Sequence, residues 1–270
     1  MKNHRLIFGS GLSAYKDYEG LYRVCHVAMQ CGITMFDTAP SYQTEALIAR
    51  AVHTSAQMLG MNRTDYAIQT KIDPIQMYNG HVVEYFKSKL QEMNLDYVDS
   101  LLIHWPVEKY LFETWEALLR LKEEGVALQI GICNLRERHL QRYHSMGIVP
   151  EILQIERHPL NTFVREVDWC QTHGVALQDY SPLCKMHPQI RENKSLQTIA
   201  EKYGKEIGQI ILRWHIDTGA TPIFTSKNTD RIKQYAGIFD FGLSPEEIAA
   251  ISALNSNHKL YLESLVCPGF

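Results

Sequence analysis

ITMFDT, residues 33–38, is the first of three β-like runs that end on polar side chains; the others are YAIQTKI (66–72) and VDSLLIHW (98–105). Isoleucine, valine, threonine and aromatic residues, which favour extended structure, recur in these runs. Five more runs of this kind occur elsewhere: RLIF (5–8), ALQIGIC (127–133), ILQIERH (152–158), VALQDYS (175–181) and TPIFTS (221–226). The chain is therefore predicted to contain eight strands.

A stretch that can form an amphipathic helix follows each of these runs. The clearest is FETWEALLRLKEE, residues 112–124, where helical spacing places Phe112, Trp115, Leu118 and Leu119 on one face. Glycines stand just past four of the expected helices, where helices commonly end: Gly32, Gly125, Gly147 and Gly174.

Eight strand–helix units in an undivided sequence are typical of a closed parallel barrel. No linker rich in Pro, Gly or Ser interrupts the alternation. We therefore expect one α/β domain over residues 1–270: a single (β/α)8 TIM barrel with an extra C-terminal helix and tail. An open doubly wound sheet, which alternates in the same way, is the alternative.

Composition limits the class of protein. The chain has 270 residues, a formal net charge of -3 and no long run of one charge sign, so we expect no nucleic-acid partner and no membrane partner. The six cysteines form no CxxC pair, so we expect no metal site. Scattered thiols and an N-terminus without an apolar signal run predict a cytoplasmic protein. The sequence does not indicate an oligomeric state.

Polar residues stand where strands two to four end. Asp37 ends the first of them, and Tyr42 follows five residues later; Lys71 and His104 end the next two, and Trp105 follows His104. Each residue alone has an ordinary structural explanation, as a helix cap, a loop aromatic, a solvated lysine or a core histidine. Their common position changes the interpretation, because the carboxyl ends of barrel strands carry active sites.

These side chains suit carbonyl reduction, which needs a hydride donor and a proton donor to the developing alkoxide. A free tyrosine has a pKa of about 10 and is a weak acid near neutrality. A neighbouring ammonium favours tyrosinate and lowers that pKa, and a carboxylate keeps the ammonium in place. An imidazole at the rim can orient the carbonyl group.

The motifs around these residues closely resemble those of the aldo-keto reductases. FDTAPSYQTE (36–45), IQTKI (68–72) and LLIHWP (101–106) resemble the segments with the family's catalytic Asp, Tyr, Lys and His. GICNL, LQIERHPL and QDYSPL resemble later segments that contact the cofactor. The resemblance extends from about Leu6 to the C-terminus. It implies a TIM barrel that reversibly reduces an aldehyde or ketone, a small-molecule carbonyl substrate, with NAD(P)H.

The resemblance also implies residue roles. Tyr42 would be the proton donor, Lys71 and Asp37 its tuners, and His104, with Trp105, would hold the substrate carbonyl. The implied cofactor contacts run from the nicotinamide to the adenosine end: Asp37, Cys133, Asn134, Gln154, Tyr180, Ser181, Leu183, Ser226 and Arg231.

Four positions depart from the family's common pattern. Cys133 replaces a serine, so one hydrogen bond to the carboxamide is expected to be weak. Arg157 replaces an aromatic residue, and Tyr235 an asparagine near the adenine. Thr225 replaces a lysine that faces the 2′-phosphate of NADP; Arg231 remains and Lys227 is near. NADPH is therefore the predicted cofactor, with NADH as the alternative.

Three other functions compete with this one. Residues 9–14, GSGLSA, fit the G-x-G-x-x-A pattern of a Rossmann dehydrogenase, but no domain break follows. Lys71 at a barrel strand end would suit a Schiff-base aldolase, which leaves Asp37 and Tyr42 unexplained. A catalytically weak cofactor-binding barrel that acts as a sensor or partner subunit is the third. Substrate identity would depend on three loops, residues 106–112, 183–195 and 261–270.

Overall fold

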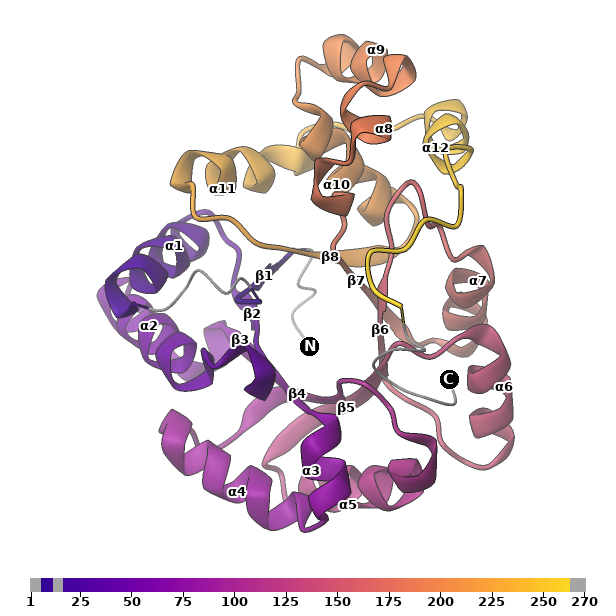
Figure 1. Ribbon diagram of the computed structural model, residues 1–270. Coiled ribbons are helices and arrows are strands. Elements are labelled where there is room, and N and C mark those ends of the chain that lie inside the picture. Colours follow the sequence, from indigo (N-terminus) through magenta and orange to yellow (C-terminus); the bar gives the residue numbers. More distant parts are fainter. Residues whose placement is uncertain (1–5, 12–16, 263–270) are drawn as a thin grey trace.

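Eight parallel strands close into a barrel in the computed structural model, which describes residues 6–11 and 17–262. Figure 1 looks into this barrel, with the strands forming an inner ring and the helices an outer one. The strands are β1 (Ile7–Gly9), β2 (Met35–Asp37), β3 (Ala67–Ile72), β4 (Val98–Ile103), β5 (Ala127–Cys133), β6 (Ile152–Glu156), β7 (Ala176–Tyr180) and β8 (Ala220–Phe224).

Each predicted run overlaps one of these strands. β5 matches its run, β2, β3, β4, β6 and β7 are shorter by one to three residues, and β1 and β8 each include one residue outside the predicted run. β1 pairs with both β2 and β8, with Phe8 opposite Phe36 on one side and Phe224 on the other. This double pairing closes the barrel, so the open doubly wound sheet and the Rossmann alternative built on it are wrong. The prediction of a (β/α)8 barrel is confirmed.

Helices follow the strands and cover the outside of the barrel (Figure 1). Among the described residues they are α1 (Tyr18–Gln30), α2 (Glu45–Met58), α3 (Pro74–Asn79), α4 (Val82–Met93), α5 (Leu111–Glu123), α6 (Glu137–Ser145), α7 (Val164–His173), α8 (Pro188–Arg191), α9 (Lys194–Tyr203), α10 (Ile207–Asp217), α11 (Thr229–Ala236) and α12 (Pro245–Ser252). Helix α12 comes after the helix that follows β8, and is the expected extra C-terminal helix.

The predicted ends of helices α1, α5, α6 and α7 are confirmed, but the predicted buried face of α5 is partly wrong. The glycines just past these helices all have positive φ, which suits a residue without a Cβ. In α5, Phe112 and Leu119 are 40% and 41% exposed, whereas Leu111 and Leu121 are buried beside Trp115 and Leu118. The helix begins one residue earlier than expected, and its buried apolar residues recur at Leu111, Trp115, Leu118 and Leu121, so Phe112 and Leu119 fall beside this face rather than on it.

The barrel interior is apolar at one level and polar above it. Ile7, Met35, Ala67 and Ile223 come from adjacent strands in register and form one apolar cluster inside the barrel. On the far side, Gly131 lets β5 approach β6 closely, because a Cβ at this position would lie 2.3 Å from the Ile152 carbonyl oxygen. The polar side chains inside the barrel, such as Asp37 and Gln69, lie two residues farther along their strands than this apolar layer, toward the carboxyl ends.

Arg157, which departs from the family pattern, is held in a buried ion pair beside β7. Its Nη1 donates to Asp179 Oδ2 at 2.8 Å, its Nε donates to the Thr162 carbonyl at 2.9 Å, and its guanidinium lies 4.1 Å from the Trp214 ring centre. His215 Nδ1 also lies 2.6 Å from Asp179 Oδ2. Although burial alone would raise it, the Arg157 charge and the His215 hydrogen bond hold the pKa of Asp179 below its usual range.

Some expectations fall on residues that the structure does not describe. They are Arg5 of the first run, Leu12–Ala14 of the glycine motif, and residues 263–270 of the tail, including Cys267. None of the described helices combines the length with the apolar character that crossing a membrane requires.

Removing one member of the Arg157–Asp179 pair is expected to destabilise the fold strongly. Asp179→Asn leaves the Arg157 charge buried without its counter-ion, a change that typically costs about 3–5 kcal/mol of unfolding free energy. The double variant Arg157→Met/Asp179→Asn removes both charges and is expected to recover part of that loss. Urea unfolding of both variants measures the difference. A double variant no more stable than Asp179→Asn would contradict the ion pair as the cause.

Candidate active site

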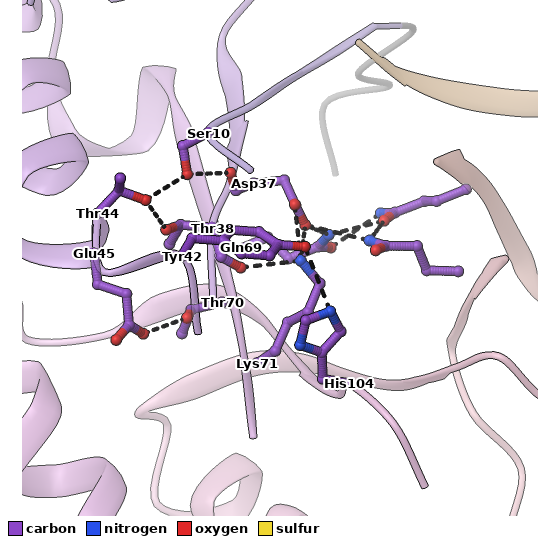
Figure 2. A network of polar contacts seen from close by, with 12 residues as sticks. Ser10, Asp37, Thr38, Tyr42, Thr44, Glu45, Gln69, Thr70, Lys71 and His104 are labelled. Carbon is purple, nitrogen blue, oxygen red and sulfur yellow. Dashed lines mark hydrogen bonds and ion pairs between the residues drawn. The ribbon is translucent and has the colours of Figure 1, made fainter. Parts of the chain in front are cut away.

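Three neighbouring strands bring four polar side chains to one rim of the barrel (Figure 2). Asp37 is the last residue of β2, and Tyr42 ends the short helical turn Pro40–Tyr42 that follows. Lys71 lies near the end of β3, and His104 comes directly after β4. The structure therefore brings together all four residues that the strand-end argument selected.

Lys71 is 1% exposed, and its ammonium is held by the residues of β2. Its Nζ lies 2.8 Å from each carboxylate oxygen of Asp37 and donates to the Thr38 carbonyl at 3.0 Å. Burial alone would lower the pKa of Lys71, but the charge and hydrogen bond of Asp37, together with Tyr42 and Cys133, outweigh burial and raise the pKa above its usual value. Lys71 is therefore a fixed positive charge under the rim.

Three glutamines inside the barrel support the Asp37 carboxylate. Gln69 and Gln154 donate through Nε2 to Asp37 Oδ2 at 2.7 and 3.2 Å. Both also donate to Gln178 Oε1, and Gln178 returns a hydrogen bond to Gln69 Oε1 at 3.0 Å. The sequence argument did not find Gln69 or Gln178. Their placement on β3 and β7 was visible, but their side chains meet only because the barrel closes.

Tyr42 lies between the ammonium and the imidazole. Lys71 Nζ is 5.0 Å from the centre of its ring, and its hydroxyl oxygen is 3.4 Å from His104 Nε2. Burial raises the pKa of Tyr42 to about 12, although Lys71 lowers it. The expected lowering by the ammonium is thus present, but burial outweighs it. Tyr42 is accordingly a hydroxyl at neutral pH and holds a proton that it can donate.

Asp73 joins this group, although the sequence argument missed it. One of its carboxylate oxygens contacts His104 Nδ1, and the other accepts from the Ser41 backbone N–H at 2.7 Å. Although burial alone would raise it, the His104 and Ser41 contacts lower the pKa of Asp73. The signal in the sequence was its position, two residues after Lys71, where the β3 segment reaches the same rim.

A cavity of about 1090 Å³ opens over these residues. Asp37, Tyr42, His104 and Trp105 form one part of its wall. The wall continues along β7, β8 and the start of α11, through residues that include Tyr180, Ser181, Leu183, Lys185, Glu206, Thr225, Asp230, Arg231, Tyr235 and Tyr261. The cavity therefore extends from Asp37, Tyr42, His104 and Trp105 toward the first turn of α11.

Most of the expected cofactor contacts line this cavity. Gln154, Tyr180, Ser181, Leu183 and Arg231 do so, together with Thr225. Of the other expected contacts, three are buried outside the described cavity wall: Cys133, Asn134 and Ser226.

Asn134 and Ser226 use their side chains within the protein. Asn134 Nδ2 donates to the His104 carbonyl at 2.9 Å, and Tyr180 Oη donates to Asn134 Oδ1 at 2.9 Å. Ser226 Oγ accepts from the Asn228 backbone N–H at 3.1 Å. In this arrangement these two residues support the cavity wall from behind.

The cavity suits an elongated ligand with an anionic end. Its volume exceeds the roughly 300–1,000 Å³ typical of pockets for drug-sized molecules, which leaves room for a dinucleotide beside a small substrate. Tyr180 adds an aromatic ring to the cavity wall, and the exposed Arg231, in the first turns of α11, adds a positive charge. The residues present thus fit a nicotinamide dinucleotide.

Comparison with known proteins identifies the family. The Aldo/keto reductase family matches residues 5–256. The uncharacterized oxidoreductase YtbE of Bacillus subtilis is 34% identical over 251 residues, covering 93% of this chain and 89% of that protein. Glyoxal reductase of Bacillus subtilis is 33% identical, covering 94% and 90%. Methylglyoxal reductase DkgA of Escherichia coli O157:H7 is 33% identical, covering 86% and 84%.

A solved structure supports the same assignment. The aldo-keto reductase of Bombyx mori, in complex with NADP, has a TM-score of 0.89 and 30% identity, covering 96% of this chain and 92% of that one. The chain belongs to the aldo/keto reductase family. It is an oxidoreductase that depends on a nicotinamide cofactor.

Lys71→Met is expected to raise the pKa of Tyr42 above its present value of about 12, because Lys71 is the charge that opposes burial there. The titration of Tyr42 alone is obtained from tyrosinate absorbance against pH, by subtracting the curve of the Lys71→Met/Tyr42→Phe double variant from that of Lys71→Met. Subtracting the curve of Tyr42→Phe from that of the wild type gives the reference pKa. An unchanged pKa would show that Lys71 does not act on Tyr42.

Proposed function

We propose that this protein reversibly reduces an aldehyde or ketone to an alcohol with NADPH. The observation that carries the proposal is the joint position of Asp37, Tyr42 and His104 in the wall of a cavity large enough for cofactor and substrate, with the buried Lys71 bound to Asp37 behind them. A hydride donor and a proton donor must reach the same carbonyl group, and this cavity offers space for the first beside a hydroxyl for the second.

Tyr42 is the proposed proton donor. Its hydroxyl lines the cavity and keeps its proton at neutral pH, so it can protonate the developing alkoxide. Lys71 stabilises the tyrosinate that remains, and Asp37 keeps the ammonium charged and in place. His104 and Trp105 line the cavity beside Tyr42 and are proposed to hold the substrate carbonyl.

The cofactor supplies the hydride when it is bound. We propose that Tyr180 stacks on its nicotinamide ring, with Gln154, Asn134, Cys133 and Asp37 nearby. Ser181 and Leu183 lie along its pyrophosphate, and Ser226 and Arg231 near its adenosine end. Tyr180 is kept in place by the hydrogen bond to Asn134, which in turn holds the His104 backbone. Cofactor and substrate contacts are thus joined by one chain of hydrogen bonds.

The preference for NADPH over NADH is proposed to be modest. Arg231 can meet a 2′-phosphate with a planar fork of donors, and Thr225 adds no charge at the position of the family's usual lysine. Asp230 and Glu206 line the same part of the cavity and repel a phosphate. These two carboxylates oppose the attraction between Arg231 and a 2′-phosphate, which narrows the advantage of NADPH over NADH.

The proposed substrates are small reactive carbonyl compounds. The relatives named above include a glyoxal reductase and a methylglyoxal reductase. Tyr261 packs edge-on against Tyr180, with ring centres 5.9 Å apart, and so limits the space on the tail side. We propose further that residues 1–270 act as one domain and that the protein is cytoplasmic, since the five described cysteines are free thiols.

Tyr42→Phe is expected to lower kcat for reduction of methylglyoxal by about 10² to 10⁴, the usual contribution of general acid catalysis. The ring still fills its place, so NADPH binding should change little. Tyr261→Phe is the matched control, since it removes a hydroxyl from the same cavity and should keep most activity. Steady-state kinetics and fluorescence titration of NADPH check both. A Tyr42→Phe variant with near-normal kcat would overturn the assignment.

Arg231→Ala is expected to lower kcat/KM for NADPH by about tenfold or more and to leave the NADH value nearly unchanged, because a hydrogen bond to a charged group is worth roughly 1.5–3 kcal/mol. Thr225→Lys should raise NADPH affinity selectively. Parallel kinetics with both cofactors measure the two ratios. Equal losses with NADPH and NADH in Arg231→Ala would show that this residue does not read the 2′-phosphate.

A further inference from the structure

Asp73 contacts both the tyrosine segment and the histidine of the site through its carboxylate. It lies at the start of α3, three residues before Gln76, whose Oε1 accepts from the Asp73 backbone N–H at 3.0 Å. An Asp before a proline usually begins a helix and needs no other role. Here, however, its carboxylate also holds the Ser41 backbone N–H and the His104 ring.

These two contacts decide which nitrogen of His104 carries the hydrogen. An ionised carboxylate only accepts hydrogen bonds, so His104 Nδ1 must be the donor to Asp73. A neutral ring then has no hydrogen on Nε2. That bare nitrogen faces the Tyr42 hydroxyl at 3.4 Å and accepts from it. Neither the Tyr42 proton nor His104 Nε2 is then directed toward a carbonyl oxygen.

We propose that Asp73 is a positioning residue that fixes His104 in the tautomer with hydrogen on Nδ1, so that His104 can donate to a substrate carbonyl only when its ring is protonated. Protonation places a hydrogen on Nε2, which polarises the carbonyl oxygen. It also releases the Tyr42 hydroxyl from its bond to His104. Both effects favour transfer of a hydride and a proton to the carbonyl group. Carbonyl reduction therefore becomes faster at lower pH. This inference rests on the proposed function.

The charged groups around His104 set the pH range of this effect. Burial lowers the pKa of His104 below its usual value, and the Lys71 ammonium adds to the lowering. Asp73 and Asp37 act in the opposite direction and favour the protonated ring. Tyr42 is a neutral hydroxyl at these pH values. His104 is therefore mostly neutral at pH 7, and its protonated form becomes populated only below the ordinary pKa of a histidine.

Asp73→Asn tests the proposal with little risk to the fold, because asparagine begins helices as well as aspartate does. The Ser41 N–H requires an acceptor, so the amide oxygen takes that contact and the amide nitrogen faces His104 Nδ1. The amide then donates to Nδ1, and the hydrogen moves to Nε2. A neutral His104 of this variant can donate to a carbonyl at any pH.

The first experiment is the pH dependence of kcat/KM for methylglyoxal with NADPH, between about pH 5 and pH 9. The wild type is expected to gain up to about tenfold per pH unit on acidification, above the pKa of His104. Asp73→Asn is expected to be nearly flat over the same range. Gln76→Ala is the matched control, since it removes the other hydrogen bond of this helix start without touching His104. It should keep the wild-type profile.

The second experiment does not depend on activity. Nitrogen-15 NMR of the histidine rings distinguishes the two tautomers, and a His104→Gln variant assigns the signals. The wild type at neutral pH should show hydrogen on Nδ1, and Asp73→Asn should show it on Nε2. The same tautomer in both proteins, equal pH profiles, or an altered profile in Gln76→Ala would each overturn the proposal. A wild type that binds no NADPH would overturn the proposed function instead, while the tautomer assignment would still stand or fall by NMR.

Discussion

The buried ammonium of Lys71 is the constraint on which the site depends. A charge taken out of water costs several kcal/mol unless a counter-ion and hydrogen bonds replace the solvent. β2 supplies Asp37, and the closure of the barrel brings glutamines from β3, β6 and β7 to support that carboxylate. Neither an open sheet nor a barrel with a different register would bring these four strands to one carboxylate. The polar layer and the closed fold therefore require each other.

The sequence allowed prediction of those parts of the site that depend on strand order alone. Asp37, Lys71 and His104 stand at strand ends, and the carboxyl ends of parallel strands share one rim, so their proximity followed without coordinates. Tyr42 was found for the same reason, since it follows Asp37 by only five positions. These inferences needed the period of the strands and the closure of the sheet, and nothing about side-chain directions.

Other features depend on three-dimensional detail that a linear pattern does not contain. Asp73 precedes a proline, where an aspartate ordinarily begins a helix, so its contact with His104 was not predicted from the sequence. The pKa of Tyr42 was expected to fall beside an ammonium, but the degree of burial decides the outcome and is not visible in sequence. Ser226 matched a family motif, yet it packs behind the cavity wall. In α5 the apolar residues form two overlapping faces, and the structure buries the one with Leu111 and Leu121 rather than the one with Phe112 and Leu119.

Cys133 has a chemical consequence for a protein that handles electrophiles. This thiol is completely buried near Lys71 and Tyr42, and burial raises its pKa far above the usual range. Only a thiolate attacks carbonyl carbons or alkylating agents at an appreciable rate. Cys133 can therefore lie close to Lys71 and Tyr42 as a protonated thiol that does not react with electrophiles. The enzyme is spared the hemithioacetals and alkylated adducts with which aldehydes inactivate proteins whose active-site cysteines are exposed.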